Sequence, residues 1–195
     1  MAEEPSFSSS DLAYLNTEYR TLEQLCAGRD ETPGDVRELI AAGRLPQATY
    51  VLPDGVELYP PDYFALIDDA GGVDELFERF RSRYAAASSD LPDDLNETWQ
   101  GYLSGQFGKC LWSVTPEAMA EKTRLMNAIE ALVGASEEVS EVWRTALRGN
   151  VDRLDALERP FTEYDRGLWG DTSRDRCITR VRQRFPAVFD APAMS

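Results

Sequence analysis

Apolar residues recur at helical spacing from about residue 73 almost to the end of the chain. In the stretch VDELFERFRSRYAAA, one helix face carries Val73, Leu76, Phe77, Phe80 and Tyr84. Similar faces follow at residues 95–107, after Thr115-Pro116, at residues 136–159 and at about residues 173–185. Such stripes are buried when helices pack on helices. Residues 73–190 are therefore predicted to form a C-terminal helical bundle.

The first 70 residues combine short capped helices with a hairpin. An opening helix is predicted from about Ser10 to Glu18. Thr21 is followed by a glutamine at the capping-box position, and Thr32 precedes a proline at a first helical position. In TYVLPDGVELYP, two apolar runs flank Asp54-Gly55, which is typical of a β-hairpin. Gly71-Gly72 breaks the pattern, so the predicted units are residues 1–70 and 73–190.

This order of elements over residues 21–67 resembles the winged helix-turn-helix of MerR-type regulators. TLEQL corresponds to the first helix, DVRELIAAGRLP to the second, and the strands about Asp54-Gly55 to the wing. PPDYFALI would be the helix after the wing. The predicted fold is mainly α, with an N-terminal winged helix-turn-helix-like unit that contains a small β-hairpin, followed by the helical bundle. A fold of this kind says little about function.

Four segments spread over residues 14–176 resemble a family of unknown function, DUF6058. The segments are YLNTEYRTLEQL, LIAAGRLPQATYVLPDGVELYPPDYF, GYLSGQFGKCLWSVTPE and, most of all, LDALERPFTEYDRGLWGDTSRDR. The resemblance implies an actinobacterial protein of natural-product biosynthesis. It implies no catalytic residues, so none is assigned.

Histidine is absent, which removes the commonest general base and the commonest zinc ligand. The chain also lacks GxGxxG and GxxxxGK[ST] motifs, so neither a metal nor a nucleotide cofactor is expected. Three widely spaced cysteines, Cys26, Cys110 and Cys177, indicate reduced thiols rather than disulfides. No apolar stretch is long enough to span a membrane and no secretion signal is recognisable, so we expect a cytoplasmic protein without a membrane partner.

Charge bears on whether the helix-turn-helix-like unit binds DNA. Residues 1–70 hold four arginines and 14 acidic residues, so they carry −10 of the chain's net charge of −15. Duplex DNA binding requires neutralised phosphates, and this unit would be repelled by them. DNA is therefore not an expected partner. The unit is interpreted as a module for packing or for binding a partner protein.

The best candidate site lies in residues 158–176, where arginines alternate with aromatic and acidic residues. We expect ligand contacts from Arg159, Tyr164, Asp165, Arg166, Trp169, Arg174 and Arg176. An arginine would hold a carboxylate or phosphate in a bidentate fork while Tyr164 or Trp169 stacks on the ligand. The alternative is an Arg–Asp network that fixes the crossing of the last two helices. Pro160, Gly167 and Gly170 are expected to keep the segment from forming regular helix.

Weaker candidates lie elsewhere. An apolar ligand cavity could be lined by Trp99, Tyr102, Phe107 and Trp112, although aromatic residues at this spacing are more often core. Cys110 could be a thiolate activated by the ammonium of Lys109, or a packed thiol. Glu57, Asp62 and Tyr63 could act as acid–base residues, but Asp62 is expected to cap the next helix and Glu57 to be solvated.

Three hypotheses for function follow. The leading one is an accessory protein of natural-product metabolism that binds a partner protein or a small acidic metabolite. The second is a small cofactor-independent enzyme that uses carboxylate, tyrosine and arginine side chains. The third is a MerR-like transcriptional regulator, which the fold favours and the charge opposes.

Overall fold

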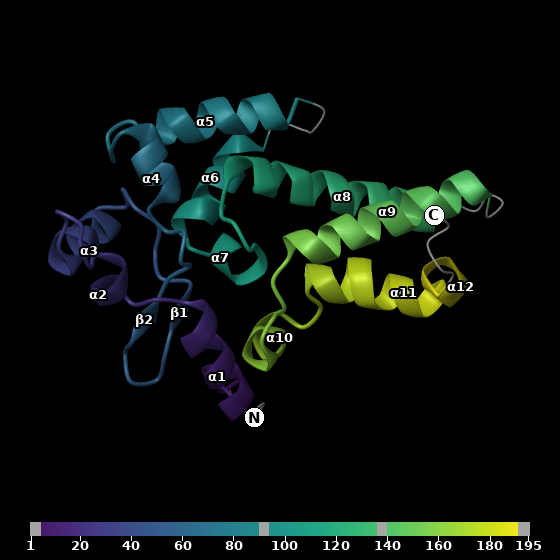
Figure 1. The fold of residues 1–195 in the computed structure, drawn as a ribbon, viewed down its shortest axis with the longest axis horizontal. Helices are drawn as coiled ribbons and strands as arrows, with labels where there is room; N and C mark the ends of the chain where they lie inside the picture. The colour runs from purple at the N-terminus through teal and green to yellow at the C-terminus, as the bar shows by residue number, and fades with distance from the viewer. Residues whose placement is uncertain (1–4, 90–93, 136–139, 191–195) are drawn as a thin grey trace.

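Helices dominate the chain in a computed structural model that describes residues 5–89, 94–135 and 140–190. Within these ranges the strands form one antiparallel hairpin, so the predicted mainly α fold with a small hairpin is confirmed (Figure 1). In chain order the elements are α1 (Ser9–Glu18), α2 (Leu22–Leu25), α3 (Pro33–Ala41), β1 (Tyr50–Val51), β2 (Glu57–Leu58), α4 (Ala65–Ala70), α5 (Leu76–Ala87), α6 (Leu95–Leu103), α7 (Phe107–Cys110), α8 (Pro116–Gly134), α9 (Glu141–Leu157), α10 (Glu163–Trp169), the π-helical turn η1 (Asp175–Thr179), α11 (Arg180–Arg184) and α12 (Pro186–Phe189).

Capping boxes start the first three helices. The side chains of Ser8, Thr21 and Thr32 each accept a hydrogen bond from the third helical N–H, and the side chain of that third residue bonds back. These bonds satisfy amides that have no partner within the helix. The helix starts predicted at Thr21 and Thr32 are confirmed. The opening helix begins at Ser9, one residue before the predicted start.

The hairpin pairs Tyr50 with Leu58 and Val51 with Glu57, and its turn contains Gly55 at a φ of 84°. The positive φ favours glycine, as the Asp-Gly signal predicted. The inward residues Tyr50 and Leu58 pack on α1 in a small core of their own.

The largest core contains side chains from both sides of the predicted boundary at residues 71 and 72. Leu22, Tyr59, Phe80 and Leu111 all belong to it. Gly71 and Gly72 both have positive φ and turn the chain from α4 into α5, and α5 packs on α8. The glycine pair therefore marks a bend within one shared core.

Two long helices, α8 and α9, lie side by side with the short helix α11 in the C-terminal part of the molecule. Figure 1 shows α8, α9 and α11 alongside one another, and they share a second core that includes Leu125, Val151 and Ile178. The helix predicted at residues 136–159 is α9, although residues 136–139 lie outside the described ranges. The helix predicted at residues 173–185 is interrupted, because the backbone forms η1 before it continues as α11.

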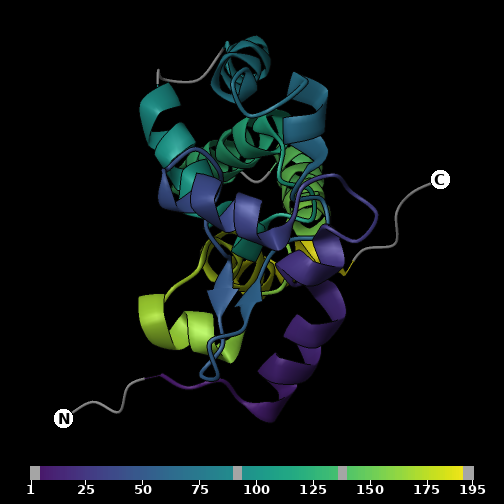
Figure 2. The same ribbon diagram turned by 90° about the vertical axis from the view of Figure 1, so that its left-hand side faces the viewer.

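The segment expected to be irregular contains a helix, so that expectation is wrong for residues 163–169. Thr162 caps α10 in a capping box with Asp165, and Gly170 ends the helix at a φ of 70°. Figure 2 shows the hairpin between α10 and α1. Hydrogen bonds join these elements: Tyr50 Oη donates to Asp165 Oδ2 over 2.7 Å, and the Glu163 amide donates to Asp11 Oδ1 over 3.0 Å.

Glycines in the run GYLSGQFG allow the segment around α7 to approach the chain before β1. A Cβ on Gly105 would lie 2.4 Å from the carbonyl oxygen of Gln47, and a Cβ on Gly108 would lie 2.2 Å from Thr49 Oγ1. These glycines allow the two segments to pack closely.

Among the described helices, none combines the length and the apolar character that crossing a bilayer requires.

Candidate functional site

An open cavity of about 300 Å³ lies where α7, α8 and the end of α10 meet. Its lining consists of Gln106, Phe107, Cys110, Lys122, Phe161, Trp169, Asp171, Thr172 and Ser173. This volume is at the lower end of the range for small-molecule sites, which are typically apolar pockets with a few convergent polar groups. The cavity has that composition, because its lining includes three aromatic rings and an ammonium.

Lys122, which lines the cavity, forms a buried ion pair with Glu158. Lys122 Nζ lies 2.8 Å from Glu158 Oε1 and donates to Ser173 Oγ over 3.1 Å, while Ser173 Oγ itself donates to Glu158 Oε1. The side chains of Lys122 and Glu158 are 13% and 0% exposed. A charge this deep is stable only when it is paired and hydrogen-bonded. Glu158 and Ser173 therefore fix the ammonium at the cavity wall.

Cys110 also lies beside this ammonium, and its thiol is buried. Burial raises the pKa of Cys110, although Lys122 acts in the opposite direction. Burial disfavours the charged form of Lys122, but Cys110 and Glu158 outweigh it, so the pKa of Lys122 is raised. Near neutral pH the lysine is thus an ammonium and the thiol keeps its proton. The neighbouring cation is Lys122, and not Lys109 as the sequence suggested.

Lys109 occupies a second buried position beside Trp169 of the cavity lining. Its Nζ lies 4.4 Å from the ring centre of Trp169, 4.9 Å from that of Tyr50, and 3.5 Å from Asp165 Oδ1. Only two of the chain's 20 basic residues are lysines, and both lie here with mostly buried side chains. Everywhere else the chain uses arginine. A compact ammonium fits these enclosed positions better than a planar guanidinium does.

Of the seven predicted site residues, only Trp169 lines this cavity. Asp165 is fully buried, where it caps α10 and accepts hydrogen bonds from Thr162 and Tyr50. Tyr164 stacks on Phe7 with ring centres 3.9 Å apart.

The predicted arginines are spread over several surroundings. Arg159 is buried and donates to the carbonyl oxygen of Leu111. Arg166 pairs with Asp175 at 3.3 Å, and Arg174 pairs with Asp155. Arg176 is exposed on η1. The structure therefore does not bring these side chains together in one pocket.

The four aromatic residues considered for an apolar cavity are also separated. Phe107 lines the open cavity, whereas Trp99 and Phe77 line a different cavity of about 220 Å³. Trp112 is exposed and covers the guanidinium of Arg159 at 4.5 Å. Tyr102 lines a separate, small cavity described next.

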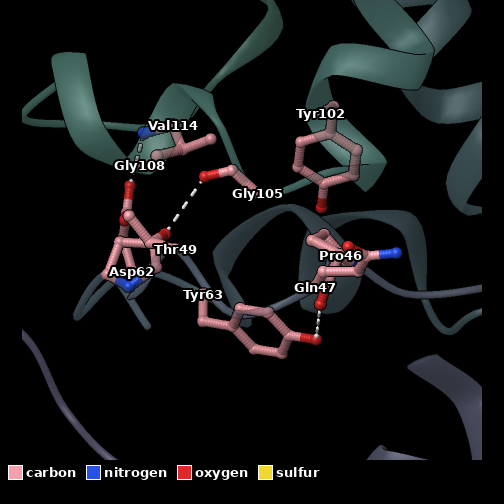
Figure 3. A pocket seen from close by; sticks show the side chains of 10 residues that line it. Pro46, Gln47, Thr49, Asp62, Tyr63, Tyr102, Gly105, Gly108 and Val114 are labelled. Carbon is pink, nitrogen blue, oxygen red and sulfur yellow. Dashed lines mark hydrogen bonds between the residues drawn. The ribbon is translucent and has the colours of Figure 1, made fainter. Parts of the chain in front are cut away.

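This small cavity measures about 20 Å³ and lies between the chain before β1 and the α6–α7 segment (Figure 3). Its lining consists of Pro46, Gln47, Thr49, Pro60, Asp62, Tyr63, Tyr102, Gly105, Gly108 and Val114. Asp62 was expected to cap the following helix, but its Oδ2 instead accepts from the amide of Val114 over 2.8 Å. A volume of this size holds one or two water molecules and excludes a metabolite.

Sequence reasoning missed Lys122, and it included Glu158 and Ser173 only as members of the wider segment 158–176. One signal was available for Lys122. It lies between Met119 and Leu125 on the stripe of α8 that faces the core, where a lysine needs an acidic partner. No local pattern marks Ser173, because its partners come from α8 and the end of α9.

A model of a family of unknown function, DUF6058, matches residues 73–186. The chain belongs to this DUF6058 family. The matched region contains Lys122, Glu158, Ser173 and the whole lining of the open cavity, whereas residues 1–72 precede it. No curated protein and no solved structure matches the chain. In the ranges described, no cluster of Cys, Asp and Glu side chains is arranged to hold a metal ion.

Proposed function

We propose that this DUF6058 protein binds a small metabolite in the open cavity. The observation that carries the proposal is a cavity of about 300 Å³ whose lining contains aromatic rings and a largely buried ammonium. The ligand would place a flat apolar ring against Trp169, Phe107 and Phe161. An oxygen of the ligand, from a carboxylate or a carbonyl group, would accept a hydrogen bond from Lys122.

The bonds of Lys122 leave room for such an acceptor. Two of its three N–H groups serve Glu158 and Ser173, and the third has the sulfur of Cys110 beside it. Sulfur is a weak acceptor, so a ligand oxygen would form a stronger hydrogen bond in its place. Both a neutral carbonyl and the acidic metabolite expected from the sequence offer this oxygen. The resemblance noted in the sequence supports a place for this role in actinobacterial natural-product metabolism.

Catalysis is less well supported than binding. A general base at neutral pH needs a pKa near the working pH. The pKa values of Lys122 and Cys110 are both raised, which keeps both groups protonated. The cluster is therefore suited to holding a ligand rather than to removing a proton from it.

Two features of residues 1–70 oppose DNA binding: their negative net charge, and the hydrogen bonds and ion pairs that already engage their arginines. All four arginines of residues 1–70 already donate to oxygen atoms of the chain; they are Arg20, Arg29, Arg37 and Arg44. On α3, Arg37 is held by Glu23 and Glu57. We propose that residues 21–67 form a winged helix-turn-helix-like packing module, which is supported by the order of α2, α3, the hairpin and α4.

A titration with matched ring compounds tests the binding proposal. Naphthoate and naphthamide share the ring but differ in charge, so they separate acid binding from carbonyl binding. With lysine-specific isotope labelling the protein gives two lysine side-chain signals. We expect Lys122 to shift most, and Lys122→Met to weaken binding at least about tenfold, which corresponds to one lost hydrogen bond.

Arg81→Met is the matched control, because this exposed arginine pairs with Glu78 and neither residue lines the cavity. It should leave the affinity unchanged. The proposal is wrong if neither compound shifts the Lys122 signal, or if Lys122→Met binds as tightly as the control.

A further inference from the structure

Two residues that line the small cavity each carry a buried polar atom without a hydrogen-bond partner among the described residues. These atoms are the hydroxyl oxygen of Tyr102 and Oδ1 of Asp62. Tyr102 is 3% exposed. Buried polar groups in native proteins almost always have a partner, and a missing one usually means an ordered water or ion. Both atoms therefore indicate a guest in this cavity.

Three polar side chains around the cavity already make hydrogen bonds within the chain. In Figure 3, Tyr63 donates to the carbonyl oxygen of Pro46, Thr49 donates to that of Gly105, and Asp62 accepts from Val114. A molecule bound here would therefore form hydrogen bonds with the Tyr102 hydroxyl and with Asp62 Oδ1.

We propose that the small cavity is a binding site for one or two ordered water molecules that link the Tyr102 hydroxyl to Asp62 Oδ1. A volume of about 20 Å³ exceeds the space that one water needs and is far below that of any metabolite. Water also has the required chemistry, because it can accept a hydrogen bond from Tyr102 and donate one to a carboxylate.

The direction of these bonds follows from protonation. Burial raises the pKa of Tyr102, and the nearby Asp62 carboxylate raises it further. The tyrosine keeps its proton and donates to the water, and the water donates to Asp62 Oδ1. No direct hydrogen bond joins Tyr102 to Asp62.

The site lies where residues 1–70 pack against the region that the family model matches, residues 73–186; this contact is called the seam below. Asp62 comes from the segment between β2 and α4, and Tyr102 from α6. The same seam contains the close approaches at Gly105 and Gly108, which leave no space for side chains. Bound water would fill the remaining space and, through its hydrogen bonds, stabilise the packing of α6 and α7 against residues 1–70. Because α7 carries Phe107 and Cys110, this packing also supports part of the lining of the open cavity.

Tyr102→Phe tests the proposal through the sign of the change in Tm. If water is bound, the variant loses a hydrogen bond and Tm falls by about 2 to 4 °C. If the cavity is dry, the variant removes an unpaired buried hydroxyl and Tm rises. Tyr63→Phe is the matched control, because it removes a known direct bond to Pro46 and must lower Tm.

A crystal structure of the full chain gives the direct observation. We expect density for water within hydrogen-bond distance of Tyr102 and Asp62, and its weakening or loss in Tyr102→Phe. An empty cavity, a rise in Tm for Tyr102→Phe, or a metal cation with contacts shorter than hydrogen bonds would each overturn the proposal.

Discussion

Replacing Lys122 by methionine measures how strongly the buried ion pair stabilises the fold. Methionine keeps the apolar stem, so the variant loses the ammonium and its bonds to Glu158 and Ser173. The Glu158 side chain is 0% exposed, so its carboxylate would stay buried without a cation. Breaking a buried pair in this way costs about 3 to 5 kcal/mol. In a chain of this size we expect Tm to fall by roughly 10 °C.

A double-mutant cycle separates the pair from its surroundings. Lys122→Met combined with Glu158→Met removes both charges, so it should recover most of the loss. The exposed pair of Arg81 and Glu78 is the control, with side chains that are 54% and 56% exposed. Arg81→Met should cost no more than about 1 kcal/mol, because solvent screens exposed pairs. Urea unfolding followed by circular dichroism gives the free energies of unfolding of the wild type, the two single variants, the double variant and Arg81→Met.

The same pair predicts a pH dependence at the alkaline end. The pKa of Lys122 is raised in the folded protein, so the contribution of the ion pair to stability is complete below the ordinary lysine pKa of about 10.4 and is lost as pH rises through the higher folded value.

The reasoning about the mutant cycle is refuted if Lys122→Met lowers the free energy of unfolding no more than Arg81→Met does, or if the double variant is less stable than Lys122→Met alone.

Other variants test separate features. Gly108→Ala should destabilise the protein in thermal unfolding because of the close contact at its Cβ position, whereas Gly149→Ala, in open space on α9, should stabilise it by about 0.5 to 1 kcal/mol. At the acid end, the hydrogen bond from Arg79 lowers the pKa of Asp69 to about 2, so its contribution is present above about pH 4 and is lost as pH falls toward 2; NMR titration of the Asp69 carboxyl carbon checks this value. Arg174→Ala should lower Tm and leave the affinity for naphthoate unchanged, since Arg174 does not line the open cavity; weaker binding at unchanged Tm would instead support the arginine site expected from the sequence.

Local signals were sufficient for most of the helices. A helix start depends on atoms within a few residues, so Thr21, Thr32 and Thr115 could be recognised as caps from their neighbours alone. The same holds for the hairpin turn at Gly55. The short helix α10 was not predicted although Thr162 and Asp165 form a capping box, because Pro160, Gly167 and Gly170 are residue types typical of irregular backbone.

The cavity could not be predicted in the same way, because its parts are distant in the sequence. Composition pointed to arginines, but whether an arginine faces a ligand or an aspartate depends on tertiary packing. Arg174 meets Asp155 across a helix interface, and Arg166 meets Asp175 across the turn after α10. Lys122 and Glu158 are 36 positions apart and meet only when α8 and the end of α9 are packed.

The hydrogen bonds between α10 and the hairpin bear on where this chain can be cut. A fragment that begins at residue 73 would contain the whole matched family region but would lack Tyr50, the hydrogen-bond donor to the buried Asp165. It would also lose Tyr19, whose hydroxyl donates to the carbonyl oxygen of Gly108, and Phe7, which stacks on Tyr164. For this chain, an expression fragment drawn to the family boundaries would leave α7 and α10 uncovered on one side.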